Sequence, residues 1–210
     1  MSLLENISNA LQTGKSKTVP AMVEQAVSEG VSAQNILDKG LLDGMGKLGV
    51  RFRNNEVFVP EVLLAARALN KSTEILKAKL LEEGVKPIGK IVIATVKGDL
   101  HDIGKNLVKM MLEGVGFEVI DLGIDIPEDA IVNAVKEHKP QILALSALLT
   151  TTMGELETVI KALKDAGVRD QVKVLVGGAP ISQTFSDQVG ADAYSEDAAG
   201  AADVAKSLIA

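Results

Sequence analysis

The chain has 210 residues, 47% of them apolar but only 2% aromatic, so its cores must be built from aliphatic side chains. This length suits two small domains with separate cores. The formal net charge of -6 disfavours nucleic acid or an anionic membrane surface as partners, because both attract clustered Lys and Arg. The absence of cysteine excludes disulfides, thiolate metal sites and a thiol nucleophile.

The sequence carries no pattern of a targeting or membrane-spanning segment. Its start, Met1 to Asn6, lacks a basic region followed by a long apolar stretch, and no apolar run approaches the length of a membrane span. We therefore expect a cytoplasmic protein.

Helical periodicity dominates the first 83 residues. Apolar residues recur on one face between Val59 and Leu80, and Pro60 lies near the start of this helix, where a missing N–H costs little. The same pattern predicts three earlier helices, at 2–13, 17–29 and 33–48. Short connections between four helices predict an antiparallel bundle, and we assign residues 1–84 to it.

The stretch 85–89 breaks the helical period, and we expect it to link the bundle to a second domain, residues 90–210. There, runs rich in β-branched residues alternate with amphipathic helices. The predicted strands cover 91–96, 118–120, 142–145, 172–176 and 191–194, and the predicted helices cover 103–115, 128–138, 152–166, 181–188 and 197–208. This alternation predicts an α/β domain with a doubly wound, parallel, five-stranded sheet in the flavodoxin-like (Rossmann-like) order 2-1-3-4-5.

Ligands of such sheets bind beyond the carboxyl ends of the strands, at the switch point between the first and third strands. The loops to inspect therefore begin near Lys97, Ser146 and Gly177. The first loop, 98–106, is not a phosphate-binding loop, because five residues separate its glycines and no Ser or Thr follows its lysine. No Gly-x-Gly-x-x-Gly follows the strand, and Ser146 stands where a receiver domain requires an aspartate.

This first loop places Asp99 two residues before His101. A neutral imidazole can bind a metal through one ring nitrogen while a carboxylate accepts a hydrogen bond from the other, which fixes the tautomer and raises ligand basicity. The residues alone leave a second interpretation open, an ordinary helix-capping loop in which Asp99 or Asp102 accepts backbone N–H groups.

The loop resembles the Asp-x-His-x-x-Gly motif of cobalamin-binding proteins, with Asp99, His101 and Gly104 at the motif positions. Ser146-Ala147-Leu148 and Gly177-Gly178 match two further family patterns after the third and fourth strands. The helical half is similar to the cap of corrinoid proteins in methyltransferase systems, through 41–46, Phe52 and 57–61. The resemblance thus covers nearly the whole chain and extends to the cobalamin-binding module of methionine synthase and to the methanol, methylamine and O-demethylase corrinoid proteins.

The resemblance implies that cobalamin binds with its own base displaced, with His101 as the lower cobalt ligand and with the nucleotide tail threaded into the sheet domain. Ser146 and Thr150 would hydrogen-bond the tail, Gly177 and Gly178 would leave room for it, and Ala198 would flank its far end. The remaining implied cofactor-binding residues of the sheet domain are Gly98, Asp99, Leu100, Asp102, Ile103, Gly104 and Leu148.

In the helical cap, the resemblance implies that Met45, Phe52, Phe58 and Val59 shield the upper face of the corrin. The alternative for these positions is plain bundle core, and core is the better interpretation for Met45. With the predicted helix boundaries, Phe52 and Phe58 lie in one connecting stretch. Exposed aromatic rings there would be unfavourable unless they covered a bound group.

The implied function is that of a methyl carrier rather than a complete enzyme, with no catalytic side chain of its own. The cobalt would accept a methyl group from the substrate of one partner methyltransferase and pass it to a second, with tetrahydrofolate or a thiol as acceptor. A reductive activating protein would be a third partner. Two alternatives remain open, an adenosylcobalamin-binding module of a mutase or light sensor, which would carry a different cap, and a cofactor-free interaction protein. The sequence does not identify the methyl donor, the acceptor, the oligomeric state or the lower base.

Overall fold

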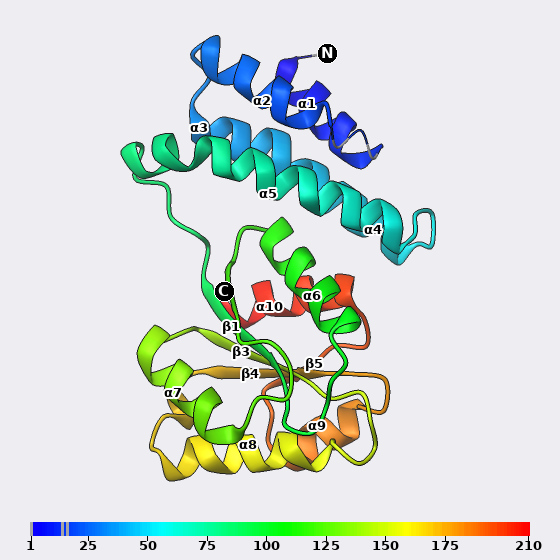
Figure 1. Ribbon diagram of the computed structural model, residues 1–210, viewed down its shortest axis with the longest axis vertical. Helices are drawn as coiled ribbons and strands as arrows, with labels where there is room; N and C mark the ends of the chain where they lie inside the picture. The colour runs from blue at the N-terminus through cyan, green and yellow to red at the C-terminus, as the bar shows by residue number, and fades with distance from the viewer. Residues whose placement is uncertain (1, 14, 16) are drawn as a thin grey trace. The chain divides into compact units, whose positions relative to one another are not determined.

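The computed structural model describes residues 2–13, 15 and 17–210. It divides into a helical unit, Met1–Pro87 with Gly114–Gly116, and a sheet unit, Ile88–Glu113 with Phe117–Ala210. Figure 1 shows helices alone in the first and a sheet covered by helices in the second. No helix among the described residues is long and apolar enough to cross a membrane.

The helical unit is held by aliphatic side chains on facing helices. Its elements are α1 (Leu3–Gln12), α2 (Val19–Ser28), α3 (Ala33–Asn35), the π-helix η1 (Ile36–Leu42), α4 (Asp43–Arg53) and α5 (Val59–Glu82). Ile7, Leu11, Ile36, Leu48 and Leu76 are at most 1% exposed and form part of its core. On α5, the positions Val62, Ala66, Leu69 and Leu76 of the predicted apolar face are buried, and the other predicted positions are partly exposed.

The predicted end of the third helix at residue 48 is wrong, because α3, η1 and α4 continue without a break to Arg53. Two glycines stay inside this run because α1 packs closely on it. A Cβ at Gly40 would lie 3.0 Å from Cγ2 of Ile7, and one at Gly44 would lie 2.9 Å from the Ser8 carbonyl oxygen. The helix ends only where Asn55 adopts a left-handed conformation, with φ of 58°.

The sheet unit has the predicted α/β architecture, with parallel strands in the order β2-β1-β3-β4-β5. Its strands are β1 (Lys90–Thr95), β2 (Glu118–Asp121), β3 (Ile142–Ser146), β4 (Lys173–Gly177) and β5 (Ala193–Tyr194). Its helical elements are α6 (Ile103–Gly114), α7 (Glu128–His138), α8 (Gly154–Asp165), η2 (Arg169–Gln171), α9 (Gln183–Val189) and α10 (Ala198–Ile209). The predicted sheet order is therefore confirmed.

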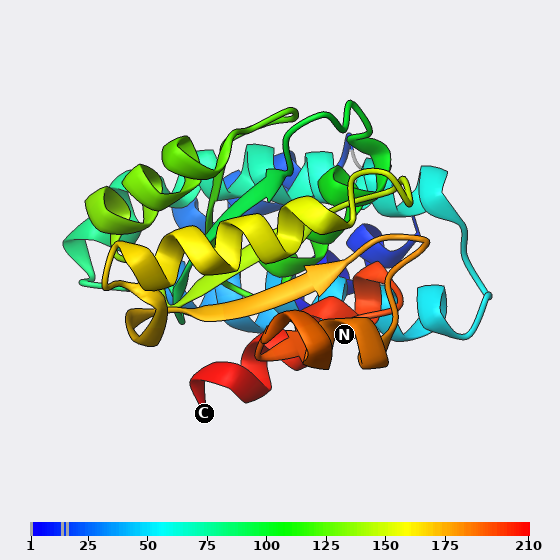
Figure 2. The ribbon, with the colours of Figure 1, turned by 90° about the horizontal axis from the view of Figure 1, so that it is seen from below.

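Helices cover both faces of this sheet, which is why β1 and β3 are apolar at successive positions instead of alternating. One face packs on α7 and α8, through a cluster that joins Val92, Leu143 and Val174 to Ile131 and Leu156. Figure 2 shows α7 and α8 side by side across that face, and Figure 1 shows α6 and α10 on the other.

A buried ion pair fastens α6 to the end of β2. Lys105, only 3% exposed, places Nζ 2.6 Å from Oδ1 of Asp121 and 2.9 Å from Oδ1 of Asn106. Burial acts to raise the pKa of Asp121, but hydrogen bonds from Lys105 and from the Gly123 N–H outweigh it and lower that pKa. The first turn of α6 is thereby fixed against the sheet, directly after the loop that carries His101.

Candidate functional site

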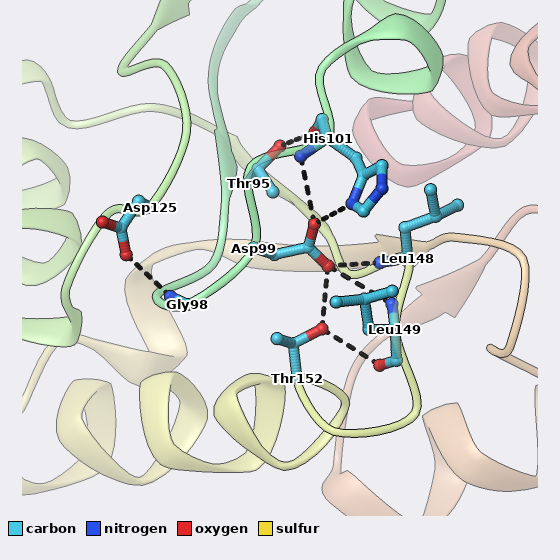
Figure 3. A network of polar contacts seen from close by, with 8 residues as sticks. All are labelled: Thr95, Gly98, Asp99, His101, Asp125, Leu148, Leu149 and Thr152. Atoms are coloured by element: carbon cyan, nitrogen blue, oxygen red, sulfur yellow. Dashed lines mark hydrogen bonds and ion pairs between the residues drawn. The ribbon is translucent and has the colours of Figure 1, made fainter.

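The carboxyl ends of β1 and β3 bring the predicted site residues to one edge of the sheet. The loop after β1 is anchored where the Thr95 hydroxyl donates to the His101 carbonyl oxygen at 2.9 Å. Asp99 then ties this loop to the one that follows β3, as Figure 3 shows. The site therefore depends on β1 and β3 being neighbours, which is the switch point of the fold.

The carboxylate of Asp99 is completely buried and accepts from both loops. Its Oδ1 lies 2.7 Å from Nδ1 of His101 and also accepts the His101 backbone N–H. Its Oδ2 accepts from Leu148 N–H at 2.7 Å, Leu149 N–H at 3.3 Å and the Thr152 hydroxyl at 2.8 Å. Burial alone would raise the pKa of Asp99, but these hydrogen bonds, that of the imidazole first, hold it far below its usual range.

The imidazole of His101 is oriented by this carboxylate and remains half exposed. An ionised carboxylate can only accept, so the proton of the neutral ring sits on Nδ1 and the lone pair on Nε2. In Figure 3 Nε2 points away from Asp99. The described residues contain no group of three or more His, Asp or Glu that could hold a metal ion. A single oriented, accessible imidazole therefore suits a metal whose other ligands belong to a cofactor, as in a corrin.

Apolar side chains are exposed on the loops after β1 and β3 and at the start of α6. Ile103 is 79% exposed and Leu100 68%, while Leu148 and Leu149 are exposed at 38% and 41%. Exposed aliphatic groups beside a metal-ligating nitrogen fit a cofactor that presents a broad apolar ring face. The residues present thus fit a corrin.

The helix-capping interpretation does not describe the observed hydrogen bonds. Asp99 accepts backbone N–H groups from its own loop and from the loop after β3, and its bonds to Leu148 and Thr152 cross about 50 residues of sequence. Asp102 accepts from the Asn106 side chain at 3.1 Å. The role expected of Asp99 toward His101 therefore has the required geometry.

The residues implied for the nucleotide tail lie along the same edge. Ser146 ends β3 and is paired in register with Gly177, which ends β4. A Cβ at Gly178, where φ is 137°, would overlap the Ala147 carbonyl oxygen, so this glycine has a packing reason independent of any ligand. Ala198 begins α10 and is buried.

Two further predicted positions fall within the His101 loop itself. Gly98 turns the chain with a φ of 77°, and Gly104 lies in the first turn of α6 with nothing within 4 Å of a Cβ built on it. Only Gly98 therefore has a conformation that favours glycine.

The cap residues are distributed differently from the prediction. Phe52 lies in the last turn of α4, not in a connecting stretch, because that helix runs five residues further than expected. Phe58 is 64% exposed directly before α5, and Val59 is its first residue. Met45 is 1% exposed, as its interpretation as core predicts.

Sequence reasoning assigned the exposed Thr150 to the nucleotide tail and did not identify Thr152 as a partner of Asp99. Thr152 is 5% exposed, and its hydroxyl lies 2.8 Å from Asp99 and 3.0 Å from the Leu149 carbonyl oxygen. No local signal separates these threonines, because the choice depends on how the loop after β3 turns toward Asp99.

We expect Thr152→Val to destabilise the fold by about 1.5–3 kcal/mol, since it removes a hydrogen bond to a buried charge. The measurement is the free energy of unfolding in urea. Thr152→Ser keeps the hydroxyl and should recover most of the loss, whereas Thr151→Val at an exposed position is the matched control. Equal stability of the Val and Ser variants would contradict this role.

Comparison with known proteins identifies the family of both parts of the chain. A family described as B12 binding domain matches residues 89–203, and a second family with the same description matches residues 3–77. The fold and the site therefore define a cobalamin-binding protein, and the cofactor predicted from the sequence is confirmed.

The relatives narrow this class. The chain is 43% identical over 210 residues to the dimethylamine corrinoid protein of Methanosarcina barkeri, covering 99% of this chain and 98% of that one. It is 44% identical over 179 residues to trimethylamine corrinoid protein 1 of Methanosarcina acetivorans, covering 84% and 83%. The chain belongs to the family of methyltransferase-associated corrinoid proteins.

Solved structures show the same fold over the full length. A cobalamin-binding protein from Desulfitobacterium hafniense matches with a TM-score of 0.82 at 34% identity and covers 100% of both chains. The methanol:cobalamin methyltransferase complex MtaBC from Methanosarcina barkeri matches with a TM-score of 0.88 at 32% identity, covering 99% of this chain and 79% of that one. The predicted combination of a helical cap and a Rossmann-like domain is confirmed, and the cofactor-free alternative is set aside.

Proposed function

We propose that this protein carries a methyl group on a corrinoid bound with its own base displaced and with His101 as the lower ligand. The observation that carries this proposal is the buried Asp99 carboxylate 2.7 Å from Nδ1 of a half-exposed imidazole. Bound corrinoid supplies a cobalt centre that can gain and lose a methyl group. The chain's own part is to orient Nε2, to keep the proton on Nδ1 and to surround the ring with apolar side chains.

Roles for the remaining predicted residues belong to the same proposal. Ser146, Thr150, Gly177, Gly178 and Ala198 would border the nucleotide tail at the edge where β3 and β4 end. The cap residues Phe52, Phe58 and Val59 would cover the upper face of the corrin, whereas Met45, 1% exposed, belongs to the bundle core. We also retain the domain assignment of residues 1–84 and 90–210, with 85–89 as linker.

The partners proposed are two methyltransferases and a reductive activating protein. The similarity to a chain of a methanol:cobalamin methyltransferase complex supports a methyltransferase partner. Relatives named for dimethylamine and trimethylamine are 43% and 44% identical over 99% and 84% of this chain, which favours a methylamine as donor. To test this choice, the reduced holoprotein is incubated with deuteromethyl-labelled amines, each with its methyltransferase. Mass spectrometry then shows whether a deuterated methyl group has moved to the cofactor.

Isotope labelling tests the ligand directly. Protein grown with 15N-histidine is loaded with unlabelled cobalamin and reduced to the Co(II) state, whose electron paramagnetic resonance spectrum shows coupling to the axial nitrogen. If His101 is the ligand, the 14N triplet of unlabelled protein becomes a 15N doublet. A triplet that labelling leaves unchanged would mean that the cofactor's own base remains bound, and the proposal would fail.

The role of Asp99 gives a prediction about acid stability. Because the pKa of Asp99 is lowered from its ordinary 3.8, its stabilisation is complete above about pH 4 and is lost as pH falls toward the folded-state pKa. Asp99→Asn should therefore reduce stability at neutral pH and make the loss of unfolding free energy below about pH 4 shallower. The same variant should weaken cobalt ligation about 10- to 100-fold. If the unfolding free energies of the native protein and of Asp99→Asn fell in parallel with pH, or if cobalt ligation by His101 were unchanged in the variant, this role of Asp99 would be wrong.

A further inference from the structure

The loop between β2 and α7, residues 122–127, runs beside the loop that carries His101. It extends the pairing of β1 with β2 beyond the end of β2: Thr95 N–H donates to the Gly123 carbonyl oxygen at 3.0 Å, and Ile126 N–H donates to the Thr95 carbonyl oxygen at 3.1 Å. Val96 and Ile126 form a further parallel bridge. The two loops thus lie against each other next to the site.

Asp125 joins these loops at two points. Its backbone N–H donates to the Asp99 carbonyl oxygen at 3.1 Å, and its Oδ1 accepts the Gly98 N–H at 2.7 Å. Figure 3 shows the carboxylate of Asp125 reaching Gly98 on the side of the loop away from Thr152. Asp125 therefore holds the backbone on both sides of the Gly98–Asp99 peptide.

The conformation of Asp125 restricts which residues can do this. Its φ is 55°, in the left-handed region that most side chains avoid and that Gly, Asn and Asp tolerate. Of these three, Asn and Asp also supply a side-chain acceptor for an N–H group. The side chain is exposed to solvent, so burial does not account for its placement.

We infer that Asp125 is a positioning residue of the ligand site, which fixes the backbone of Asp99 so that its carboxylate meets His101. The inference rests on the proposed function of His101. Asp99 lies in a loop, and its own N–H donates to the Val96 carbonyl oxygen at 3.2 Å. Asp125 supplies the acceptor for the Gly98 N–H and the donor to the Asp99 carbonyl oxygen. Loss of this support lets Asp99 shift, and the ring of His101 shifts with it.

The test compares Asp125→Gly, which keeps the left-handed backbone but removes the acceptor, with Asp125→Asn, which keeps both. Lys139→Gly is the matched control, because Lys139 also has a positive φ of 46° but lies between α7 and β3, at the amino edge of the sheet. The first readout uses the protein without corrinoid: the 15N shifts of the His101 ring and the exchange rate of its Nδ1 proton. The second is the affinity for hydroxocobalamin.

We expect Asp125→Gly to speed exchange of the Nδ1 proton and to weaken hydroxocobalamin binding about threefold to tenfold, the loss of one ordinary hydrogen bond. Asp125→Asn should restore both, and Lys139→Gly should change neither. Native-like exchange in Asp125→Gly, or equal impairment of the Gly and Asn variants, would overturn the inference. If the native protein binds no cobalamin, the proposed function fails, while the ring measurement still decides the role of Asp125.

Discussion

His101→Ala should abolish axial nitrogen coupling in the Co(II) state and weaken cobalamin binding by about 100-fold or more. Loss of a residue that only hydrogen-bonds to a metal ligand already lowers metal affinity about 10- to 100-fold. The expected cause is loss of the lone pair on Nε2, and the described residues contain no group of three or more His, Asp or Glu that could hold a metal ion instead. Visible absorption and paramagnetic resonance of the reconstituted protein are the measurements.

The chain offers its own control for this substitution. His138, the second of two histidines, lies in the last turn of α7, and His138→Ala should leave the spectrum and affinity unchanged. Added imidazole should restore the nitrogen coupling of His101→Ala, because it can enter the space left by the ring. A spectrum unaffected by the loss of His101 would remove the basis of the proposed function.

Gly178→Ala should be the most destabilising single change at the sheet edge. The alanine Cβ would overlap the Ala147 carbonyl oxygen, and the backbone φ of 137° is one that residues with a Cβ rarely adopt. Strain alone costs about 1–3 kcal/mol, so with the overlap we expect a loss of at least about 3 kcal/mol. Urea unfolding followed by circular dichroism measures it.

Gly154→Ala is the comparison for this glycine. Gly154 starts α8, and nothing lies within 4 Å of a Cβ built there, so the change should stay within about 1 kcal/mol. Similar stability of the Gly154 and Gly178 variants would show that the contact with Ala147 relaxes freely. Room for the nucleotide tail would then be the one remaining reason for a glycine at position 178.

Much of the fold follows from local patterns. The sheet order could be predicted because β-branched runs alternate regularly with amphipathic helices, and crossovers between parallel strands have a fixed hand. The pairing of Asp99 with His101 could also be predicted, since the two residues lie two positions apart in one loop. Both predictions use patterns that lie within short stretches of the sequence.

The missed features depend on packing between distant segments. Thr152 reaches Asp99 across 53 positions, and Asp125 reaches Gly98 across 27, so their roles require the register of the sheet. The third helix was predicted to end at residue 48, ahead of the polar stretch 53–56, whereas α4 continues to Arg53. Gly40 and Gly44, which lie inside the predicted helix, stay helical and make room for α1.

The five hydrogen bonds around the Asp99 carboxylate also bear on the thermodynamics of ligation. Because the ring of His101 is already held in one orientation before cobalt arrives, little rotational freedom is left to lose when the bond forms. Calorimetry should then find a small entropic penalty for ligation in the native protein. That penalty should grow in any variant that frees the imidazole.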